Sequence, residues 1–167
     1  MRFYSDFLDS DGKKIVDSII SPNGYDEDYF LDCSLTKDKL RALDCKNKFI
    51  SLSIEDDYEE EEVAFVIYTN FDKTEFIKEQ PLKYSKENAK SINELRKFLY
   101  HVNDKDECIY VRFLQCFKEG NGYGSALVDR LKEDSKNILL YSTSDARDFW
   151  EKQGFKNIYD NIYKYEG

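Results

Sequence analysis

The sequence predicts a single domain of the mixed α/β class. Segments rich in β-branched and aromatic residues alternate along the chain with segments whose apolar residues recur at helical spacing. A glycine-dense turn at residues 118–124 joins one such strand to the helix after it. The length of 167 residues fits one domain, and 13 Tyr and 12 Phe supply apolar surface for a core.

The charge balance and the polar residue types narrow the classes of function. A formal net charge of −9 disfavours nucleic-acid binding, which needs a basic surface. The same charge suits a cationic substrate such as an amine, although acidity also serves solubility. Because the chain has one His and four Cys that form no CxxC pair, we expect free thiols and no metal site.

The sequence shows no segment that resembles a signal peptide or approaches the roughly 20 apolar residues of a membrane span. A cytoplasmic protein is therefore expected, since free thiols persist in that compartment. The oligomeric state does not follow from the sequence, and a homodimer stays open.

The N-terminal half is expected to contain helices followed by a pair of strands. The first 45 residues are interpreted as mostly helical, with an apolar stripe within residues 15–20. Residues 49–54 and 63–68 are predicted to be strands. The acidic run 55–62 between them forms either a solvated hairpin loop or an acidic rim that attracts an amine.

A further helix is predicted over about residues 86–101, with Ser85 as its cap. The apolar residues at helical spacing that predict it are Ile92, Leu95, Leu99 and Val102. The single histidine, His101, falls near its end and is interpreted as structural or solvent-exposed rather than catalytic.

The C-terminal third alternates strands and helices. Its predicted elements are a strand at 109–117, a turn at 118–124, a helix at 125–132, a strand at 138–141, a helix from Ser144 to about Gly154, and a hairpin of 155–159 with 162–165. The glycine-dense turn therefore lies directly before a helix.

A turn of this kind favours binding of an anion. Glycines adopt positive φ and let the backbone approach a ligand closely, while the start of a helix offers N–H groups and the positive end of its dipole. Gly120, Gly122 and Gly124 supply this arrangement for a phosphate group. The spacing matches neither a nucleotide P-loop nor the GxGxxG of a dinucleotide fold.

A second motif follows about 20 residues later, where residues 146–155 are Ala-Arg-Asp-Phe-Trp-Glu-Lys-Gln-Gly-Phe. Together with Glu-Gly-Asn-Gly-Tyr-Gly at 119–124, this segment resembles the GNAT acyltransferase superfamily over about residues 109–155. The resemblance implies one GNAT-like domain with a mixed, mostly antiparallel central sheet flanked by helices. It implies an acceptor-side half at 1–105, with a helical insertion at about 85–101, and an acyl-CoA-binding half at 106–167.

The resemblance also implies acetyl-CoA as the co-substrate. Its pyrophosphate would bind the N–H groups of the turn, and its pantetheine arm would pair with the preceding strand. The residues implied in cofactor binding are Leu114, Cys116, Lys118, Glu119, Gly120, Asn121, Gly122, Tyr123, Gly124, Ser125, Thr143 and Trp150. Glu119 stands where the family usually has Gln or Arg; a carboxylate is unfavourable beside pyrophosphate, and Lys118 offers compensation.

The chemistry of acetyl transfer to an amine requires few groups. A base must accept the amine proton, and the candidate is Glu61 or Glu62, acting through water from the start of the strand expected beside the cofactor. The N–H of Leu114 is the candidate to polarise the carbonyl. Trp150 stands where the family often has an acidic Tyr, and an indole is no useful acid. Solvent or a nearby hydroxyl then protonates the thiolate, and the candidate hydroxyls are those of Tyr141, Ser142 and Tyr123.

Arg112 interrupts an otherwise apolar strand, so it either contacts a carboxylate of the acceptor or lies at the surface. The predicted function is transfer of an acetyl group from acetyl-CoA to a primary amine of a small molecule or a protein. Two alternatives stay open: a catalytically silent GNAT-like binding module, and an acidic interaction protein that mimics nucleic acid. The N-terminal 100 residues carry no recognisable motif that would predict the acceptor.

Overall fold

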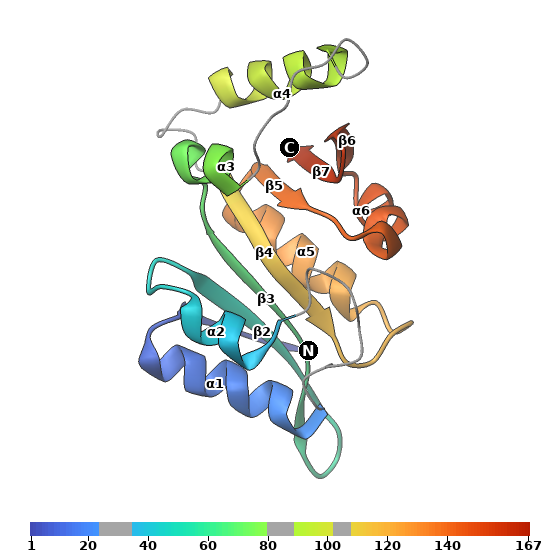
Figure 1. The fold of residues 1–167 in the computed structure, drawn as a ribbon. Coiled ribbons are helices and arrows are strands. Elements are labelled where there is room, and N and C mark those ends of the chain that lie inside the picture. Colours follow the sequence, from blue (N-terminus) through green and yellow to red (C-terminus); the bar gives the residue numbers. More distant parts are fainter. Residues whose placement is uncertain (24–34, 80–88, 102–107) are drawn as a thin grey trace. The chain divides into compact units, whose positions relative to one another are not determined.

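The structure is a computed structural model that describes residues 1–23, 35–79, 89–101 and 108–167 (Figure 1). These residues form two compact units, which are described separately below. The first unit comprises Met1–Thr69 with Val111–Leu131, and the second comprises Asn70–Tyr110 with Lys132–Gly167. Strand β4 (Cys108–Cys116) and helix α5 (Tyr123–Asp134) pass from one unit into the other.

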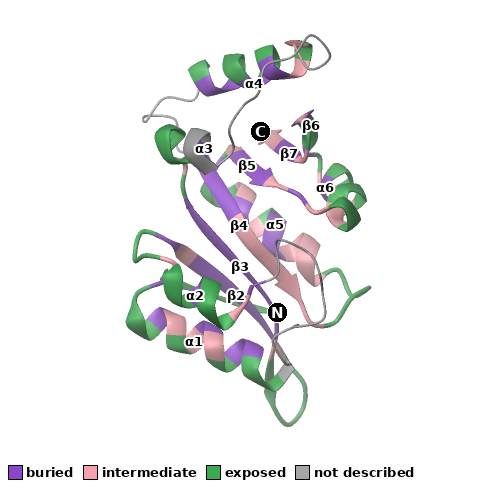
Figure 2. Ribbon diagram, in the orientation of Figure 1, coloured by how far each residue is buried: buried purple, intermediate pink, exposed green. Residues whose placement is uncertain are grey.

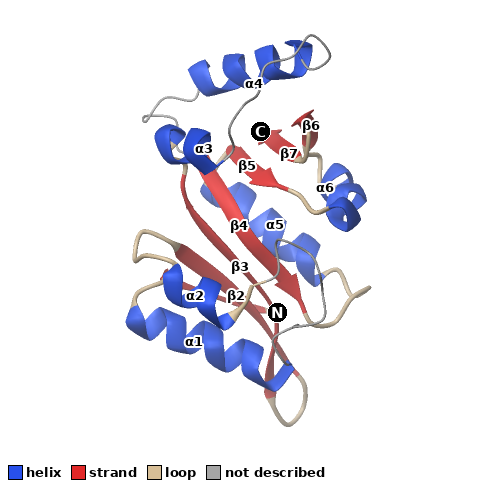
Figure 3. Cartoon of the chain, in the orientation of Figure 1, coloured by secondary structure: helices blue, strands red, loops and turns tan. Residues whose placement is uncertain are grey.

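The first unit begins with a strand and places two helices before a long hairpin (Figure 3). Its elements before β4 are β1 (Arg2–Phe7), α1 (Ser10–Ile20), the 3₁₀ turn η1 (Ser21–Asn23), α2 (Lys37–Ala42), β2 (Lys48–Glu55) and β3 (Glu60–Asn70). The strand order is β1-β2-β3-β4, and the β1/β2 and β2/β3 pairs are antiparallel.

Local capping explains where the two N-terminal helices start. Asp9 accepts a hydrogen bond from the N–H of Gly12 at the start of α1, and Thr36 accepts one from the N–H of Lys39 at the start of α2. Each side chain satisfies one of the donors that a helix leaves unpaired in its first turn. The carboxylates of Asp11 and Asp38 lie in those first turns, where their negative charge stabilises each helix by attraction to the positive end of its dipole.

The core of the first unit lies between these helices and one face of the hairpin. Val16, Ile19 and Ile20 of α1 are buried, which confirms the stripe predicted within residues 15–20. They form one buried cluster with residues of α2, β2 and β3 and of the adjoining segments. The other members of this cluster are Leu8, Leu35, Leu40, Phe49, Phe65 and Ile67. Strand β3 is buried on both faces from Val63 to Thr69, as Figure 2 shows for its whole central part.

The second unit contains the remaining elements. They are α3 (Lys73–Glu79), α4 (Ala89–His101), β5 (Asn137–Tyr141), the 3₁₀ turn η2 (Ser144–Ala146), α6 (Arg147–Lys152), β6 (Lys156–Tyr159) and β7 (Ile162–Glu166). The strand order is β4-β5-β7-β6, and β7 pairs antiparallel with both β5 and β6. A second cluster holds this unit together through Phe76, Leu95, Phe98, Leu99, Cys108, Tyr110, Leu139, Ile158 and Ile162.

The fold class is mixed α/β with mostly antiparallel strand pairing, as predicted. The strands predicted at 49–54, 63–68, 109–117 and 138–141 are confirmed, as is the C-terminal hairpin. The helix expected before β4 is present as α4, whereas the proposed cap Ser85 and Val102 lie outside the described residues. The helix expected from Ser144 begins instead as the 3₁₀ turn η2, with Thr143 in the cap position.

The prediction that the first 45 residues are mostly helical is wrong at the N-terminus. Residues Arg2–Phe7 form strand β1, which pairs with β2 along its whole length. All six residues of β1 are exposed, so the strand has no buried face that would require apolar residues at every second position. The sequence therefore lacks the alternation by which a strand is recognised. The single GNAT-like domain with halves at 1–105 and 106–167 stays a prediction, since the two compact units interleave along the chain.

Candidate functional site

The turn between β4 and α5 has the backbone geometry that its glycines predict. Gly120 and Gly122 adopt φ values of +79° and +78°, a region that residues with a side chain enter at a cost. A Cβ built on either glycine would meet no atom within 4 Å. Glycine is therefore the favoured residue at both positions, and no described side chain covers their Cα atoms.

Helix α5 begins directly after this turn. The carbonyl of Gly122 accepts a hydrogen bond of 3.0 Å from the N–H of Ala126, so Gly122 occupies the N-cap position of a 12-residue helix. The N–H groups of Tyr123 and Gly124 open the first helical turn, and no helical carbonyl lies four residues before either of them. The side chain of Asn121 donates to the carbonyl of Glu119 at 3.1 Å and holds the turn closed on itself. The turn thus presents backbone donors and the positive helix end.

The two charged side chains of the turn, those of Lys118 and Glu119, differ in whether they have a partner among the described residues. Lys118 Nζ lies 2.6 Å from Glu61 Oε2, with both side chains about half exposed. That hydrogen bond raises the pKa of Lys118, and attraction to the Glu61 carboxylate raises it further. The Glu119 carboxylate has no ion pair or hydrogen bond within the described residues. The neighbouring Cys116 thiol donates to the carbonyl of Lys118 at 3.2 Å.

The acidic run at the start of β3 separates into groups with different partners. Glu60 accepts a hydrogen bond of 2.6 Å from Ser53 Oγ and lies 3.6 Å from Arg2. Glu61 pairs with Lys118. Glu62 is half-buried, and its Oε2 is buried without a hydrogen-bond partner among the described residues. Of the three carboxylates, only that of Glu62 has a buried oxygen left for another group.

A β-bulge explains why Glu62 is half-buried. Leu52 pairs with Ala64 but Ser53 pairs with Glu62, so Val63 is the extra residue on β3. Glu62 therefore shares the face of Ser53 rather than that of Ala64, and this is the face on which Phe65 packs into the core of the first unit.

This placement changes the acidity of the carboxyl. Burial raises the pKa of Glu62 above its usual range, a hydrogen bond with Ser51 lowers it in part, and the Glu60 carboxylate raises it again. A carboxylate with a raised pKa is a better proton acceptor than an exposed one. The carbonyl of the bulged Val63 also accepts a hydrogen bond of 2.8 Å from the N–H of Phe117, which ties the bulge to the residue that follows β4.

The C-terminal part of β4 is less covered than its start. Cys108–Val111 are buried, whereas every residue from Arg112 to Cys116 is partly exposed. The predicted site residues Arg112, Leu114 and Cys116 therefore lie on a stretch of strand that is partly exposed, although Nε of Arg112 itself is buried.

Sequence comparison alone does not classify the chain, because no protein-family model and no curated protein sequence matches it at a significant level. Solved structures do match. Tetrahymena GCN5 aligns with a TM-score of 0.55 at 15% identity, covering 98% of this chain and 94% of the other. Arabidopsis thaliana NAA60 in complex with acetyl-CoA aligns with a TM-score of 0.53 at 10% identity, covering 98% and 96%. A KacT mutant aligns with a TM-score of 0.51 at 12% identity, covering 99% and 95%.

The chain has the GNAT fold. The three matched proteins are GNAT acetyltransferases, and each alignment covers nearly the whole of both chains. The structural alignments establish the shared fold. At sequence identities of 10–15% they do not establish the activity of this chain, which is argued below from its own residues. A complex described as KacTA–DNA also matches, with a TM-score of 0.50.

Most of the residues predicted from the GNAT resemblance lie in the first unit. It holds Glu61, Glu62, Arg112, Leu114, Cys116 and residues 118–125. Thr143, Tyr141 and Trp150 belong to the second unit. Trp150 is buried in edge-to-face contact with Phe149 and Phe155, and the Thr143 side chain makes no cap hydrogen bond to the turn that follows it.

Tyr141 is the last residue of β5 and is part of a chain of hydrogen bonds. Its hydroxyl oxygen accepts a bond of 3.2 Å from Asn161 Nδ2, while Asn161 Oδ1 accepts from the Arg147 guanidinium. Because the oxygen is the acceptor in this bond, the hydroxyl hydrogen of Tyr141 is not used in it. The sequence alone does not predict these hydrogen bonds, because residue type identifies Asn161 only as a turn residue.

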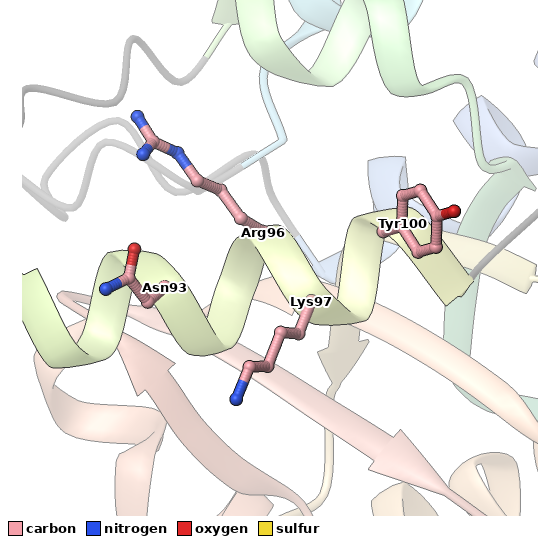
Figure 4. A pocket seen from close by; sticks show the side chains of 4 residues that line it. All are labelled: Asn93, Arg96, Lys97 and Tyr100. Atoms are coloured by element: carbon pink, nitrogen blue, oxygen red, sulfur yellow. The ribbon is translucent and has the colours of Figure 1, made fainter.

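A separate pocket of about 450 Å³ lies on the exposed face of α4 (Figure 4). The described residues that line it are Asn93, Arg96, Lys97 and Tyr100. They follow one another at helical spacing on this single helix, and none of the predicted site residues is among them. Within the described residues no group of three His, Cys, Asp or Glu could hold a metal ion, and none of the described helices is long and apolar enough to span a membrane.

Proposed function

We propose that this chain is an acyl-CoA-dependent N-acetyltransferase that transfers an acetyl group from acetyl-CoA to a primary amine of a small molecule or a protein. The observation that carries the proposal is the open glycine turn of residues 120–122 at the start of α5, on a GNAT fold. That turn suits the diphosphate of coenzyme A because its donors are backbone N–H groups that need no positive side chain. A matched structure, that of NAA60, is described as a complex with acetyl-CoA.

The co-substrate would be held by the turn and by the strand before it. The N–H groups of Gly120–Ser125 would bind the diphosphate, and the partly exposed backbone around Leu114 and Cys116 would pair with the pantetheine arm. Acetyl-CoA supplies an acyl group already activated as a thioester. Thr143 and Trp150 are proposed as further contacts to the arm, the first through its hydroxyl and the second as a packing surface.

Glu62 is the proposed base, in preference to Glu61. Its buried Oε2 has no partner among the described residues, whereas Glu61 is engaged by Lys118. The raised pKa of Glu62 favours acceptance of a proton from the amine, directly or through one water. The N–H of Leu114 is proposed to polarise the thioester carbonyl. Tyr141, whose hydroxyl oxygen is already an acceptor, is proposed to donate the proton that the departing thiolate needs.

A catalytically silent coenzyme A binding module is the second candidate. Two residues favour it: Trp150 replaces the tyrosine that the family often uses as an acid, and the exposed Glu119 carboxylate lies within the turn. Arg112 is proposed to contact a carboxylate of the acceptor, and a cytoplasmic location stays a prediction. DNA is not proposed as a partner, because the net charge of −9 opposes it.

Two measurements test the proposal. Titration calorimetry with acetyl-CoA should show micromolar binding, and incubation with a panel of primary amines should yield acetylated products detected by mass spectrometry. Product detection is preferable to thiol reagents because Cys45 and Cys116 are accessible on the protein itself. Binding without any product would favour the silent module, and no binding at millimolar acetyl-CoA would refute both in favour of an acidic interaction protein.

A further inference from the structure

Strand β1 lies at the edge of the first unit, and among the described residues its side chains are exposed, with Tyr4 lying 5.9 Å from Phe49 of β2 between ring centroids. It is the outermost strand of the order β1-β2-β3-β4, and all six of its residues are exposed. Three of those residues are aromatic, with Phe3 39%, Tyr4 47% and Phe7 53% exposed. An exposed apolar edge strand is a template for pairing with another strand.

The hydrogen bonds to β2 determine which backbone groups of β1 point outward. The N–H of Leu8, just after the strand, donates to the carbonyl of Asn47 at 2.8 Å, in line with the β1/β2 register. Because bonding pairs alternate along an antiparallel ladder, the even-numbered residues of β1 face β2 and the odd-numbered ones face away. The outward N–H and C=O groups are therefore those of Phe3, Ser5 and Phe7.

Phe7 is not available for a further strand. Its N–H donates to Asp6 Oδ1 at 2.7 Å, and its carbonyl oxygen lies so close to Gly12 that residue 12 has no room for a Cβ. The pairing edge therefore consists of Phe3 and Ser5, which make no such contacts within the described residues.

We propose that this edge binds the same edge of a second copy of the chain, as an antiparallel β1–β1 pair with its two-fold axis at Tyr4. This register joins Phe3 to Ser5 of the partner subunit by backbone hydrogen bonds, twice over, and needs nothing from Phe7. It also places Arg2 opposite Asp6 of the partner subunit, since residues two before and two after the axis face each other.

Charge complementarity favours this register over the alternative with its axis at Ser5. The alternative would need Phe7, whose backbone is already occupied, and would place Asp6 opposite an uncharged tyrosine. Arg2 is free to turn toward a new partner, because its present ion pairs with Glu55 and Glu60 are long, at 3.7 and 3.6 Å, and exposed.

Two six-residue strands bury less than the roughly 1,000 Å² expected of a stable interface, so the dimer is weak and depends on chain concentration. Sedimentation velocity over a concentration series should show a monomer–dimer equilibrium for the wild-type chain. A wild-type chain that stays monomeric at millimolar concentration overturns the proposal. Neither acetyl-CoA nor an amine is needed, so the result is independent of the proposed enzymatic function.

A mixing experiment with two charge-reversal variants tests the register. Arg2→Glu alone places Glu opposite Asp6, and Asp6→Arg alone places Arg opposite Arg2, so each homodimer should weaken about tenfold or more. A mixture of the two variants restores an opposite-charge pair on both sides of the axis and should dimerise as the wild type does. Failure of the mixture to associate more tightly than either variant alone overturns the Tyr4-centred register.

Ser5→Pro supplies an independent test of the edge. Proline removes the outward N–H of residue 5 without removing any hydrogen bond to β2, and an edge strand tolerates it. We expect this variant to be monomeric with an unchanged far-UV circular dichroism spectrum and melting temperature. A folded Ser5→Pro variant that dimerises like the wild type shows that another surface is responsible.

Discussion

Replacement of Gly122 by alanine separates the two properties that the structure assigns to this glycine. An alanine must adopt φ near +78° there, which costs about 1 kcal/mol, and its Cβ meets no other atom of the protein within 4 Å. For a chain of this size, that cost lowers the melting temperature by about 2–4 °C. A methyl group at the surface of the turn should in addition keep a diphosphate from the backbone donors, so acetyl-CoA affinity should fall by about tenfold or more, equivalent to about 1.4 kcal/mol.

Gly154→Ala is the matched control for this experiment. Gly154 has φ +85°, and a Cβ there would make only ordinary contacts with Tyr165. The control should therefore lose a similar amount of stability while keeping its acetyl-CoA affinity. Calorimetric titration and thermal melts of both variants provide the two numbers. Wild-type affinity in a folded Gly122→Ala variant would show that the turn is not the diphosphate site.

Three further predictions concern side chains. Glu62→Gln should lower kcat by about 10²–10⁴-fold, and the wild-type rate should fall with acid through a pKa above that of an ordinary glutamate, in a pH–rate profile. The pKa of Glu62 is raised in the folded state, so ionisation of this carboxyl destabilises the fold as pH rises above about 4.3, the usual pKa of an unfolded Glu. Glu62→Gln should therefore have a higher melting temperature than the wild type at pH 7. At pH 4 or below the two melting temperatures should be equal. Glu119→Gln should tighten acetyl-CoA binding, since it removes the exposed carboxylate of the turn, and tighter binding should be absent from the surface control Glu133→Gln. Tyr141→Phe should lower kcat and leave acetyl-CoA affinity unchanged in calorimetry; an unchanged kcat would leave solvent as the proton donor.

The elements that the sequence predicts well are those whose pattern is local. The run from Cys108 to Cys116 is β-branched and aromatic, and the glycines at 120–124 cannot easily be anything other than a turn, so β4 and the start of α5 follow from residue type alone. Strand β1 is missed because pairing with β2, rather than burial, holds it extended, and pairing leaves no periodic signal in the sequence.

The catalytic candidates show the same division. The sequence alone cannot choose between Glu61 and Glu62, because four consecutive glutamates carry no information about partners. The choice depends on Lys118, 57 residues later in the chain, and on an extra residue in β3 that lies within an unbroken apolar run. Long-range pairing and strand register are tertiary properties, so only the structure distinguishes the two carboxylates.

The bulge at Val63 makes the pairing of β3 matter more than its composition. If the same residues paired without the bulge, Val63 would lie opposite Ser53 and Glu62 would turn to the opposite side of the sheet, away from the face that carries Phe65. Substitution of Val63 by another apolar residue would leave the pairing register unchanged, and with it the face on which Glu62 lies. A deletion of Val63 itself would remove the bulge and still leave Glu62 opposite Ser53, so the side on which this carboxyl lies depends on how the two strands pair.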